Sequence, residues 1–248
     1  MTFAYKRALI VGGSSGVGRA LALGLAKQAC DVLAIARGGE KLKTLQAEEP
    51  NIQIRAADAS EDGFAEAVLT AHRPDLVVLA GGLTPRAQDL RETSWKDFSA
   101  PWNTDTKITF DFTRAALNLP LADGAVIINF SSGASLNGSR LSGGYAGAKR
   151  MQTFLAMYGQ QEAGKLGLGL TFLSVIPLQL IAGTDIGGTM SSAYAKGAGI
   201  TQEAFMGRWE QPLTPDAASG YLMELLGRPL QDGDQVFGLK GTGLEKLG

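Results

Sequence analysis

The chain has 248 residues, of which 45% are hydrophobic and 19% are charged, a composition typical of one globular domain with a substantial core. Its 23 basic and 24 acidic residues give a formal net charge of -1, so we expect neither a nucleic acid nor a membrane as a partner. Cys30 is the single cysteine and His72 the single histidine, which excludes an internal disulfide, a Cys/His metal site and a Ser-His-Asp triad. We therefore expect small-molecule chemistry, without a metal, in a reducing compartment, the cytoplasm.

Short apolar runs alternate with segments of helical periodicity along the chain. The expected strands comprise residues 8–11, 31–36, 52–56, 76–79, 125–130, 170–176 and 235–237. The expected helices comprise residues 16–28, 40–48, 61–71, 104–117, 145–163 and 215–226. This alternation predicts an α/β fold in which helices cover both faces of a doubly wound parallel sheet, with ligands bound beyond the carboxyl ends of the strands.

The composition does not change along the chain, so residues 1–248 are interpreted as a single domain. The segment 166–184 has no charged residue, but it contains glycines, Pro177 and Gln179, and we interpret its centre as a strand buried on both faces rather than a membrane span. Residues 177–215 are expected to form an irregular connection, with a variable substrate lid at about 183–212.

A glycine-rich turn joins the first expected strand to the first expected helix. It reads Gly12-Gly13-Ser14-Ser15-Gly16-Val17-Gly18, with the glycines spaced as GxxxGxG. Such a turn needs positive φ, lets a pyrophosphate approach the backbone and leaves the N–H groups of the next helix free for the anion. The alternative is an ordinary turn in a glycine-rich chain. In this position the motif predicts a Rossmann-like dinucleotide site that includes Gly12, Ser14, Ser15, Gly16, Val17 and Gly18.

The end of the second expected strand indicates which dinucleotide is bound. Proteins specific for NAD usually carry an acid there for the ribose 2′-hydroxyl, whereas this chain has Ala36 followed by Arg37. A guanidinium suits bidentate contact with a 2′-phosphate, although a solvated surface arginine is the alternative. The pattern favours NADP(H) over NAD(H).

Tyr145 and Lys149 are four residues apart in an expected helix, so they share one face. A phenol has a pKa of about 10, and a nearby ammonium favours the phenolate and lowers that pKa towards a range useful for acid–base catalysis. The spacing alone is common in ordinary helices. Ser132, however, follows the strand 125–130 at the end where such folds bind ligands, which makes the three side chains a candidate catalytic group.

With these motifs the chain resembles the short-chain dehydrogenase/reductase family over nearly its whole length. The resemblance implies hydride transfer between a nicotinamide and a carbonyl or secondary alcohol. It implies that Tyr145 exchanges a proton with the substrate oxygen, that Lys149 bonds the nicotinamide ribose and lowers the pKa of Tyr145, and that Ser132 orients the substrate. A noncatalytic NADP(H)-binding sensor or scaffold with the same fold is the alternative.

The resemblance also implies further contacts with the cofactor. These involve Asp58, Ala80, Gly81, Pro177 and Thr184, in addition to Tyr145 and Lys149. A family asparagine that supports proton relay falls at Asp105 when the chain is aligned on Phe110, and nearer Asn103 when it is counted from Trp95. We favour Asp105, and an ionised carboxylate there can only accept hydrogen bonds.

Family resemblance further implies a homo-oligomer, a tetramer or dimer, assembled through the expected helices 104–117 and 145–163 and the last strand. Phe110, Phe112, Leu155 and Met157 exceed what one sheet face needs, which is compatible with this arrangement. The large side chains of the lid suit either an apolar ligand or packing of the lid itself. They are Met190, Tyr194, Phe205, Met206 and Trp209.

Overall fold

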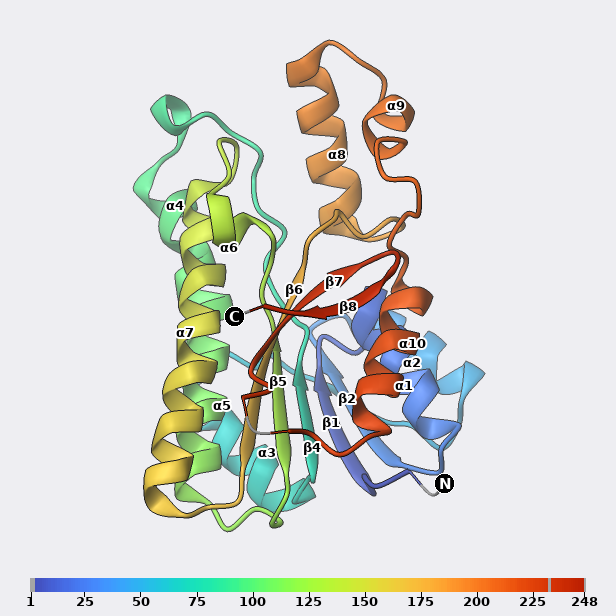
Figure 1. Ribbon diagram of the computed structural model, residues 1–248, viewed down its shortest axis with the longest axis vertical. Helices are drawn as coiled ribbons and strands as arrows, with labels where there is room; N and C mark the ends of the chain where they lie inside the picture. Colours follow the sequence, from blue (N-terminus) through green and yellow to red (C-terminus); the bar gives the residue numbers. More distant parts are fainter. Residues whose placement is uncertain (1–2, 232, 248) are drawn as a thin grey trace.

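Within residues 3–231 and 233–247, which the computed structural model describes, eight strands form one sheet in the order β3-β2-β1-β4-β5-β6-β7-β8 (Figure 1). The strands are β1 (Arg7–Val11), β2 (Asp31–Ala36), β3 (Gln53–Ala56), β4 (Leu76–Leu79), β5 (Val126–Phe130), β6 (Thr171–Pro177), β7 (Val236–Lys240) and β8 (Gly243–Lys246). Neighbouring strands are parallel from β3 through β7, whereas β8 pairs antiparallel with β7.

Helices cover both faces of this sheet, as the alternating pattern predicts. They are α1 (Gly16–Ala26), α2 (Gly39–Glu48), α3 (Phe64–His72), α4 (Trp95–Pro101), α5 (Lys107–Asn118), α6 (Ala134–Asn137), α7 (Gly143–Leu166), α8 (Asp185–Ala198), α9 (Gln202–Met206) and α10 (Pro215–Leu226), with a 3-10 turn η1 (Leu90–Glu92) and a π-helical turn η2 (Trp102–Thr106). In Figure 1, α1, α2 and α10 lie on one side and α3, α5 and α7 on the other. The predicted α/β fold class is confirmed.

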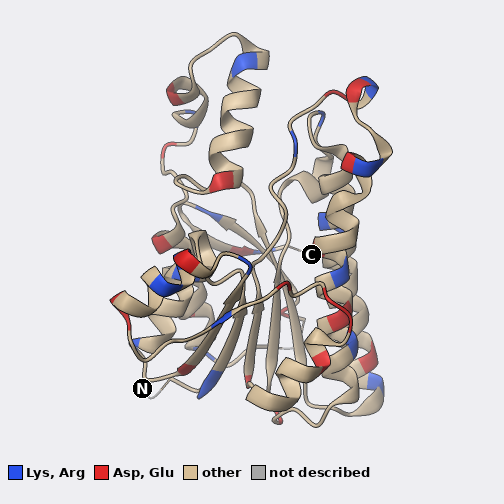
Figure 2. Ribbon diagram, turned by 180° about the vertical axis from the view of Figure 1, so that it is seen from behind, with Lys and Arg blue, Asp and Glu red and all other residues tan. Residues whose placement is uncertain are grey.

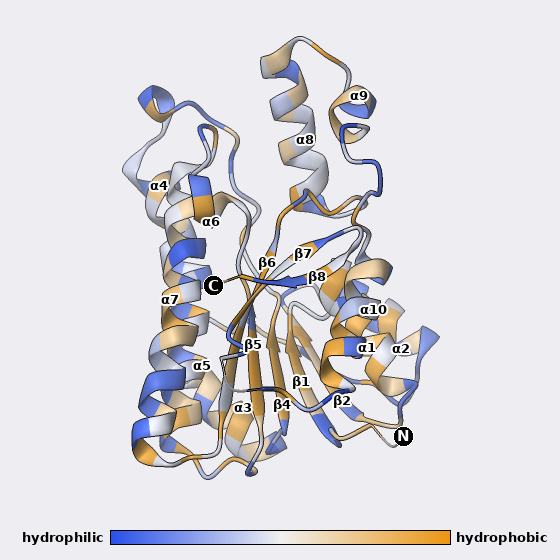
Figure 3. Ribbon diagram, viewed as in Figure 1, coloured by the Kyte–Doolittle hydropathy of each residue, from blue (hydrophilic) through white to orange (hydrophobic). Residues whose placement is uncertain are grey.

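Two apolar cores sandwich the central strands. In β4, Leu76 and Val78 belong to the core under α1 and α10, while Val77 and Leu79 belong to the core under α3, α5 and α7. All four residues are buried, so the strand reads as a continuous apolar run rather than an alternating one. Figure 3 shows this apolar centre as orange strands, and Figure 2 shows charged residues of both signs interspersed on the helices and loops around it.

The strand order reverses between β1 and β4, which are neighbours in the sheet although β2 and β3 lie between them in sequence. The loops after these two strands leave the sheet in opposite directions and create a crevice at its carboxyl edge. The glycine-rich turn follows β1, and Ala80 and Gly81 follow β4. This crevice is where the fold provides a ligand site.

The expectation of an irregular connection over 177–215 is wrong in its centre, because α8 and α9 form there. Glycines and serines weaken the helical pattern of this segment, but side-chain caps offset that weakness. The Thr184 hydroxyl accepts a hydrogen bond from Gly187 N at 3.0 Å, and Thr201 caps α9 by accepting from Ala204 N at 3.1 Å. Both helices project beyond the carboxyl ends of the strands (Figure 1).

The expected helix 104–117 also differs from the structure. Helix α4 begins at Trp95, and the π-helical turn η2 joins it to α5. Pro101 lacks the N–H of a regular helix, which explains why the regular hydrogen-bond pattern changes here. At the other end of the chain, the expected strand 235–237 is the start of the hairpin formed by β7 and β8.

Candidate active site

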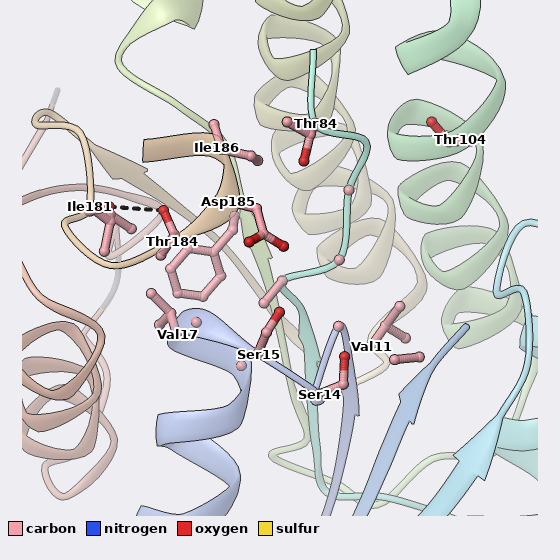
Figure 4. A pocket seen from close by; sticks show the side chains of 18 of the residues that line it. Val11, Ser14, Ser15, Val17, Thr84, Thr104, Ile181, Thr184, Asp185 and Ile186 are labelled. Atoms are coloured by element: carbon pink, nitrogen blue, oxygen red, sulfur yellow. Dashed lines mark hydrogen bonds between the residues drawn. The ribbon is translucent and has the colours of Figure 1, made fainter. Parts of the chain in front are cut away.

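A cavity of about 590 Å³ opens at the carboxyl ends of the parallel strands and is bounded on the far side by the start of α8. In Figure 4, Ser14, Ser15 and Val17 of the glycine-rich turn lie on one side, and Thr184 and Asp185 on the other. The lining includes every side chain or backbone position that the sequence assigned to the cofactor. These are Gly12, Ser14, Ser15, Gly16, Val17, Gly18, Arg37, Asp58, Ala80, Gly81, Tyr145, Lys149, Pro177 and Thr184.

Close backbone contacts explain two glycines of the turn. Gly12 has φ +85°, and a Cβ there would lie 2.4 Å from Gly81 N, so this position tolerates no side chain. A Cβ on Gly18 would lie 2.4 Å from Gly12 O. Ser15 precedes α1 without capping it through its side chain, and the first turn of α1 contains no acidic residue. The N-terminal N–H groups of α1 are therefore available to an anion.

Two cationic side chains line the cavity beyond the end of β2. Arg37 is one of them, and the other is Lys41 in the first turns of α2, which was not singled out from the sequence. Lys41 Nζ lies 3.5 Å from Asp185 Oδ2, which also lines the cavity, and both side chains are exposed. The available signal was the position of Lys41 four residues after Arg37, but its approach to the cavity depends on how α2 packs on the sheet.

Asp58 lies beside this end of the cavity, after β3. Its carboxylate accepts hydrogen bonds from the Ser60 hydroxyl at 2.7 Å and from the Ser60 amide at 2.9 Å. These bonds hold the pKa of Asp58 below its usual value, with a smaller effect from Arg37. Asp58 is thus ionised and oriented at neutral pH.

At the near end, Ser132, Tyr145 and Lys149 come together from the loop after β5 and the first turns of α7. Lys149 is 4% exposed, and its Nζ donates a hydrogen bond to Phe130 O at 3.1 Å. The same Nζ lies 5.4 Å from the centre of the Tyr145 ring. Tyr145 and Lys149 are therefore buried side by side, and Ser132, which is half-buried, lines the same cavity.

Asp105, the fourth candidate, lies behind Lys149. Its side chain is fully buried in η2, with Oδ2 3.1 Å from Lys149 Nζ and Oδ1 accepting from Leu83 N at 2.8 Å. Asn103, the other position left open by the sequence, is exposed and does not line the cavity. Asp105 does not line the cavity either, so its effect on the site acts through Lys149 and the loop after β4.

Burial and charge act in opposite directions on Tyr145 and Lys149. Burial raises the pKa of Tyr145, the Lys149 ammonium lowers it in part, and the Asp105 carboxylate raises it further. Burial is the largest single influence on Lys149 and lowers its pKa, but the Asp105 carboxylate and Tyr145 together outweigh burial, so the pKa is raised. At neutral pH the phenol is protonated and the ammonium is charged.

The loop after β6 also reaches the cavity. Thr184, besides capping α8, donates a hydrogen bond to Ile181 O at 2.8 Å (Figure 4). Gln179, Leu180 and Ile181 line the cavity and were not singled out from the sequence. They belong to the loop between Pro177 and Thr184, and no local motif marks them.

The large side chains of the lid pack against one another rather than into the cavity. Tyr194 stacks on Phe205 at 5.8 Å between ring centres, and Trp209 meets Phe205 edge-on at 6.1 Å. Met190 and Phe205 are buried. From the lid helix α8, the residues that line the cavity are Asp185, Ile186 and Gly187. The sequence left open whether these side chains contact an apolar ligand or pack the lid, and the structure shows that they pack the lid.

Among the described residues, no group of three potential metal ligands of the His, Cys, Asp and Glu types comes together. In the same part of the chain, no helix has both the length and the apolarity needed to cross a membrane. Val78 and Leu79, the last two residues of β4, are both buried. Val78 lies in the core under α1 and α10, and Leu79 lies in the core under α3, α5 and α7.

Comparison with protein families gives a match to the model described as short chain dehydrogenase, over residues 6–188. Among curated proteins, the chain is similar to an NADPH-dependent pterin aldehyde reductase of Arabidopsis thaliana, with 34% identity over 158 residues, or 59% of this chain and 64% of that protein. It is also similar to a D-erythrulose reductase of Gallus gallus, with 24% identity over 66% of this chain and 68% of that protein. The match thus spans less than two thirds of the Arabidopsis protein.

Solved structures share the fold at low sequence identity. The crystal structure of levodione reductase superposes with a TM-score of 0.81 and 19% identity, over 95% of this chain and 96% of that chain. The structure of ElxO with NADP bound gives a TM-score of 0.76 and 20% identity, over 96% of this chain and 98% of that chain. These likenesses show the fold and nothing more specific.

Proposed function

The chain belongs to the short-chain dehydrogenase family, and from that premise we propose that it is an NADP(H)-dependent oxidoreductase that interconverts a carbonyl and a secondary alcohol. The observation that carries this proposal is the continuity of one cavity. Tyr145, Lys149 and Ser132 occupy one end, while the glycine-rich turn and Arg37 occupy the other. Acid–base groups and an anion-binding turn are thereby placed within reach of one extended ligand.

The residues of the cavity fit a dinucleotide. A side chain at Gly12 or Gly18 would collide with backbone, and the open N-terminus of α1 offers N–H groups to a pyrophosphate. Asp58, whose carboxylate is ionised, accepts hydrogen bonds from the adenine end. Thr184 and Pro177 line the same cavity as Tyr145 and Lys149, and we assign all four to the nicotinamide half of the cofactor. When bound, the dinucleotide supplies or takes up the hydride.

Each catalytic side chain has a separate task. Ser132 donates a hydrogen bond to the substrate oxygen and fixes its position. Tyr145 donates its phenolic proton to that oxygen during reduction and takes a proton back during oxidation. Of the three N–H donors of Lys149, one is used by Phe130 O and one faces Asp105, which leaves one for a ribose hydroxyl.

Preference for NADP(H) follows from charge at the end of β2. Arg37 and Lys41 line the cavity there, and the strand end has no carboxylate that would accept the ribose 2′-hydroxyl. The Arabidopsis relative is named as NADPH-dependent, and ElxO has NADP bound in its solved structure. A 2′-phosphate between two cations gains more than a 2′-hydroxyl does.

The substrate is proposed to be a small uncharged carbonyl compound. The charged side chains that line the cavity, besides Lys149, are Arg37, Lys41, Asp58 and Asp185, and we assign them to the nucleotide. The other side chains that line the cavity are uncharged, and they include Thr84, Gln179, Leu180 and Ile186. The two curated relatives are named as reductases of a pterin aldehyde and of D-erythrulose.

Equilibrium titration of the chain with NADPH and with NADH tests this function first. We expect NADPH to bind at least about tenfold more tightly, because a dianionic phosphate meets two cations. Equal affinities would overturn the NADP(H) preference but not the proposed oxidoreductase activity. If neither nucleotide binds, the proposed function is overturned.

We also propose that the protein assembles as a homodimer or homotetramer in the cytoplasm, a second copy covering the outer face of η2, α5 and α7. Trp102, Phe110 and Tyr158 are 36%, 49% and 52% exposed on these elements. Phe112, which was expected from the sequence to share this face, is instead fully buried in the core. A molar mass in solution equal to that of one 26.0 kDa chain would contradict the assembly, and cell fractionation tests the compartment.

A further inference from the structure

A buried negative charge lies directly behind the lysine of the site. Asp105 is 0% exposed and Lys149 is 4% exposed, and their charged atoms are 3.1 Å apart. The Lys149 ammonium is the group that faces Asp105 Oδ2, and the contact between them is a buried ion pair. Two charges shielded from water in this way interact strongly and are screened much less by salt than exposed charges are.

The other carboxylate oxygen ties Asp105 to the loop after β4. Oδ1 accepts hydrogen bonds from Leu83 N at 2.8 Å and from the Thr104 hydroxyl at 3.0 Å. A Cβ on Gly82 would lie 2.6 Å from Oδ2, so the carboxylate packs closely against the backbone of this loop. Asp105 is therefore held in place from two elements and cannot turn away from Lys149.

The charges that face Tyr145 have opposite signs. Lys149 presents a positive charge from α7, Asp105 a negative charge from η2, and Ser132 a neutral hydroxyl from the loop after β5. The cavity's remaining ionisable side chains among the described residues follow β2 and β3 or start α8, at the nucleotide end. The ammonium that would stabilise a phenolate is thus offset by a carboxylate at its back.

We propose that Asp105 is a positioning residue that fixes Lys149 and keeps the Tyr145 phenol protonated up to higher pH, so that the site favours carbonyl reduction. This inference rests on the proposed function. In that step the carbonyl carbon accepts the hydride from the reduced nicotinamide and the C=O π bond breaks. The substrate oxygen takes the proton of Tyr145, which later regains one from solvent. A protonated phenol is the form that reduction requires.

Asp105→Asn removes the charge at nearly constant volume and tests the inference. We expect the pH at which Tyr145 ionises to fall by about one unit, because the variant removes the repulsion between the Asp105 carboxylate and the phenolate of Tyr145. Carbonyl reduction needs the protonated phenol, so the pH at which its rate declines moves to a lower value. Alcohol oxidation needs the phenolate, so its rise with pH moves to lower pH as well.

The readout is the ultraviolet difference absorbance of the Tyr145 phenolate, obtained by subtracting the matching Tyr145→Phe variant from each background. Asp111→Asn is the matched control, because Asp111 lies on α5 and pairs with Lys107 at 2.6 Å, away from the cavity. We expect no shift in this control. Asp105→Ser provides a second uncharged side chain should the asparagine variant fail to fold.

An unchanged or higher ionisation pH of Tyr145 in the Asp105 variants would overturn the inference. The absorbance measurement needs no turnover, so it separates the role of Asp105 from the proposed function. If no carbonyl is reduced but the phenolate shifts as expected, the proposed function fails and the role of Asp105 stands. If reduction occurs with a pH profile that is insensitive to Asp105, the inference fails and the proposed function stands.

Discussion

Lys41 and Lys149 divide the electrostatics of the cavity between its two ends. Lys149 is buried and held by Asp105, so its position and charge are fixed. Lys41 is exposed and pairs with Asp185 at 3.5 Å, a contact of the kind that contributes only about 0 to 1 kcal/mol. A phosphate entering the cavity can therefore draw Lys41 away from Asp185 at little cost.

Lys41→Met is expected to weaken NADPH binding by about tenfold, while NADH binding changes by less than about twofold, since one cation near a phosphate contributes on the order of 1 kcal/mol at a surface. Titration of both nucleotides measures the difference. Lys43→Met is the matched control, because Lys43 lies on the same helix but pairs with Glu40 and does not line the cavity. Equal losses for the two nucleotides would show that Lys41 does not read the 2′-phosphate.

Single residues were predictable where the signal is local. The glycine spacing, the end of β2 and the four-residue interval from Tyr145 to Lys149 each identified a side chain or backbone position that lines the cavity. Asp105 and Asn103 could not be separated by counting, because the π-helical turn η2 changes which side chain faces inward. Lys41 and Gln179 reach the cavity through tertiary packing, which no short motif records.

At the scale of elements, the contact between α4 and α7 leaves no room for a side chain. A Cβ on Gly144 would lie 1.9 Å from Phe98 O, in the turn of α7 that carries Tyr145. Gly164 lies on the same helix, and a Cβ there would meet nothing within 4 Å. An added methyl group should therefore have opposite effects on stability at the two glycines.

Gly144→Ala is expected to lower the free energy of unfolding by about 1 to 3 kcal/mol, because the helices must move apart. Gly164→Ala is expected to raise it by about 0.5 to 1 kcal/mol, since alanine favours the helix over glycine. Urea denaturation measures both changes. Destabilisation of equal size at both positions would contradict the close packing of α4 on α7.

The central strands were predictable because burial on both faces makes them largely apolar, as in β4, a continuous run of Val and Leu, and in β5, where Asn129 is the one polar residue. Helix α8 was not, because its glycines and serines give little helical signal. Its Thr184 cap and the terminal Gly199, with φ +68°, were present in the sequence as start and stop signals, but the segment between them lacks a strong apolar stripe.

For the whole molecule, the alternating pattern determined the fold class and the switch point between β1 and β4 determined the place of the cavity. The antiparallel strand β8 and the projecting helices α8 and α9 depend on contacts between distant segments and were not evident from the sequence. The proposed chemistry needs both ends of the cavity. One end holds the dinucleotide, and Tyr145 at the other end exchanges a proton with the substrate oxygen.

Comparison of the chain with its Tyr145→Phe variant tests the central claim most directly, with NADPH as reductant and D-erythrulose and a pterin aldehyde as carbonyl probes. We expect the unmodified chain to oxidise NADPH and the variant to do so about a hundredfold or more slowly. The affinity of the variant for NADPH should stay within about threefold of that of the unmodified chain, because the phenol supplies a proton and does not hold the nucleotide. Turnover that survives the loss of the phenol would contradict the proposed chemistry. A chain that binds NADPH but reduces neither probe, with or without Tyr145, would favour a noncatalytic NADP(H)-binding protein.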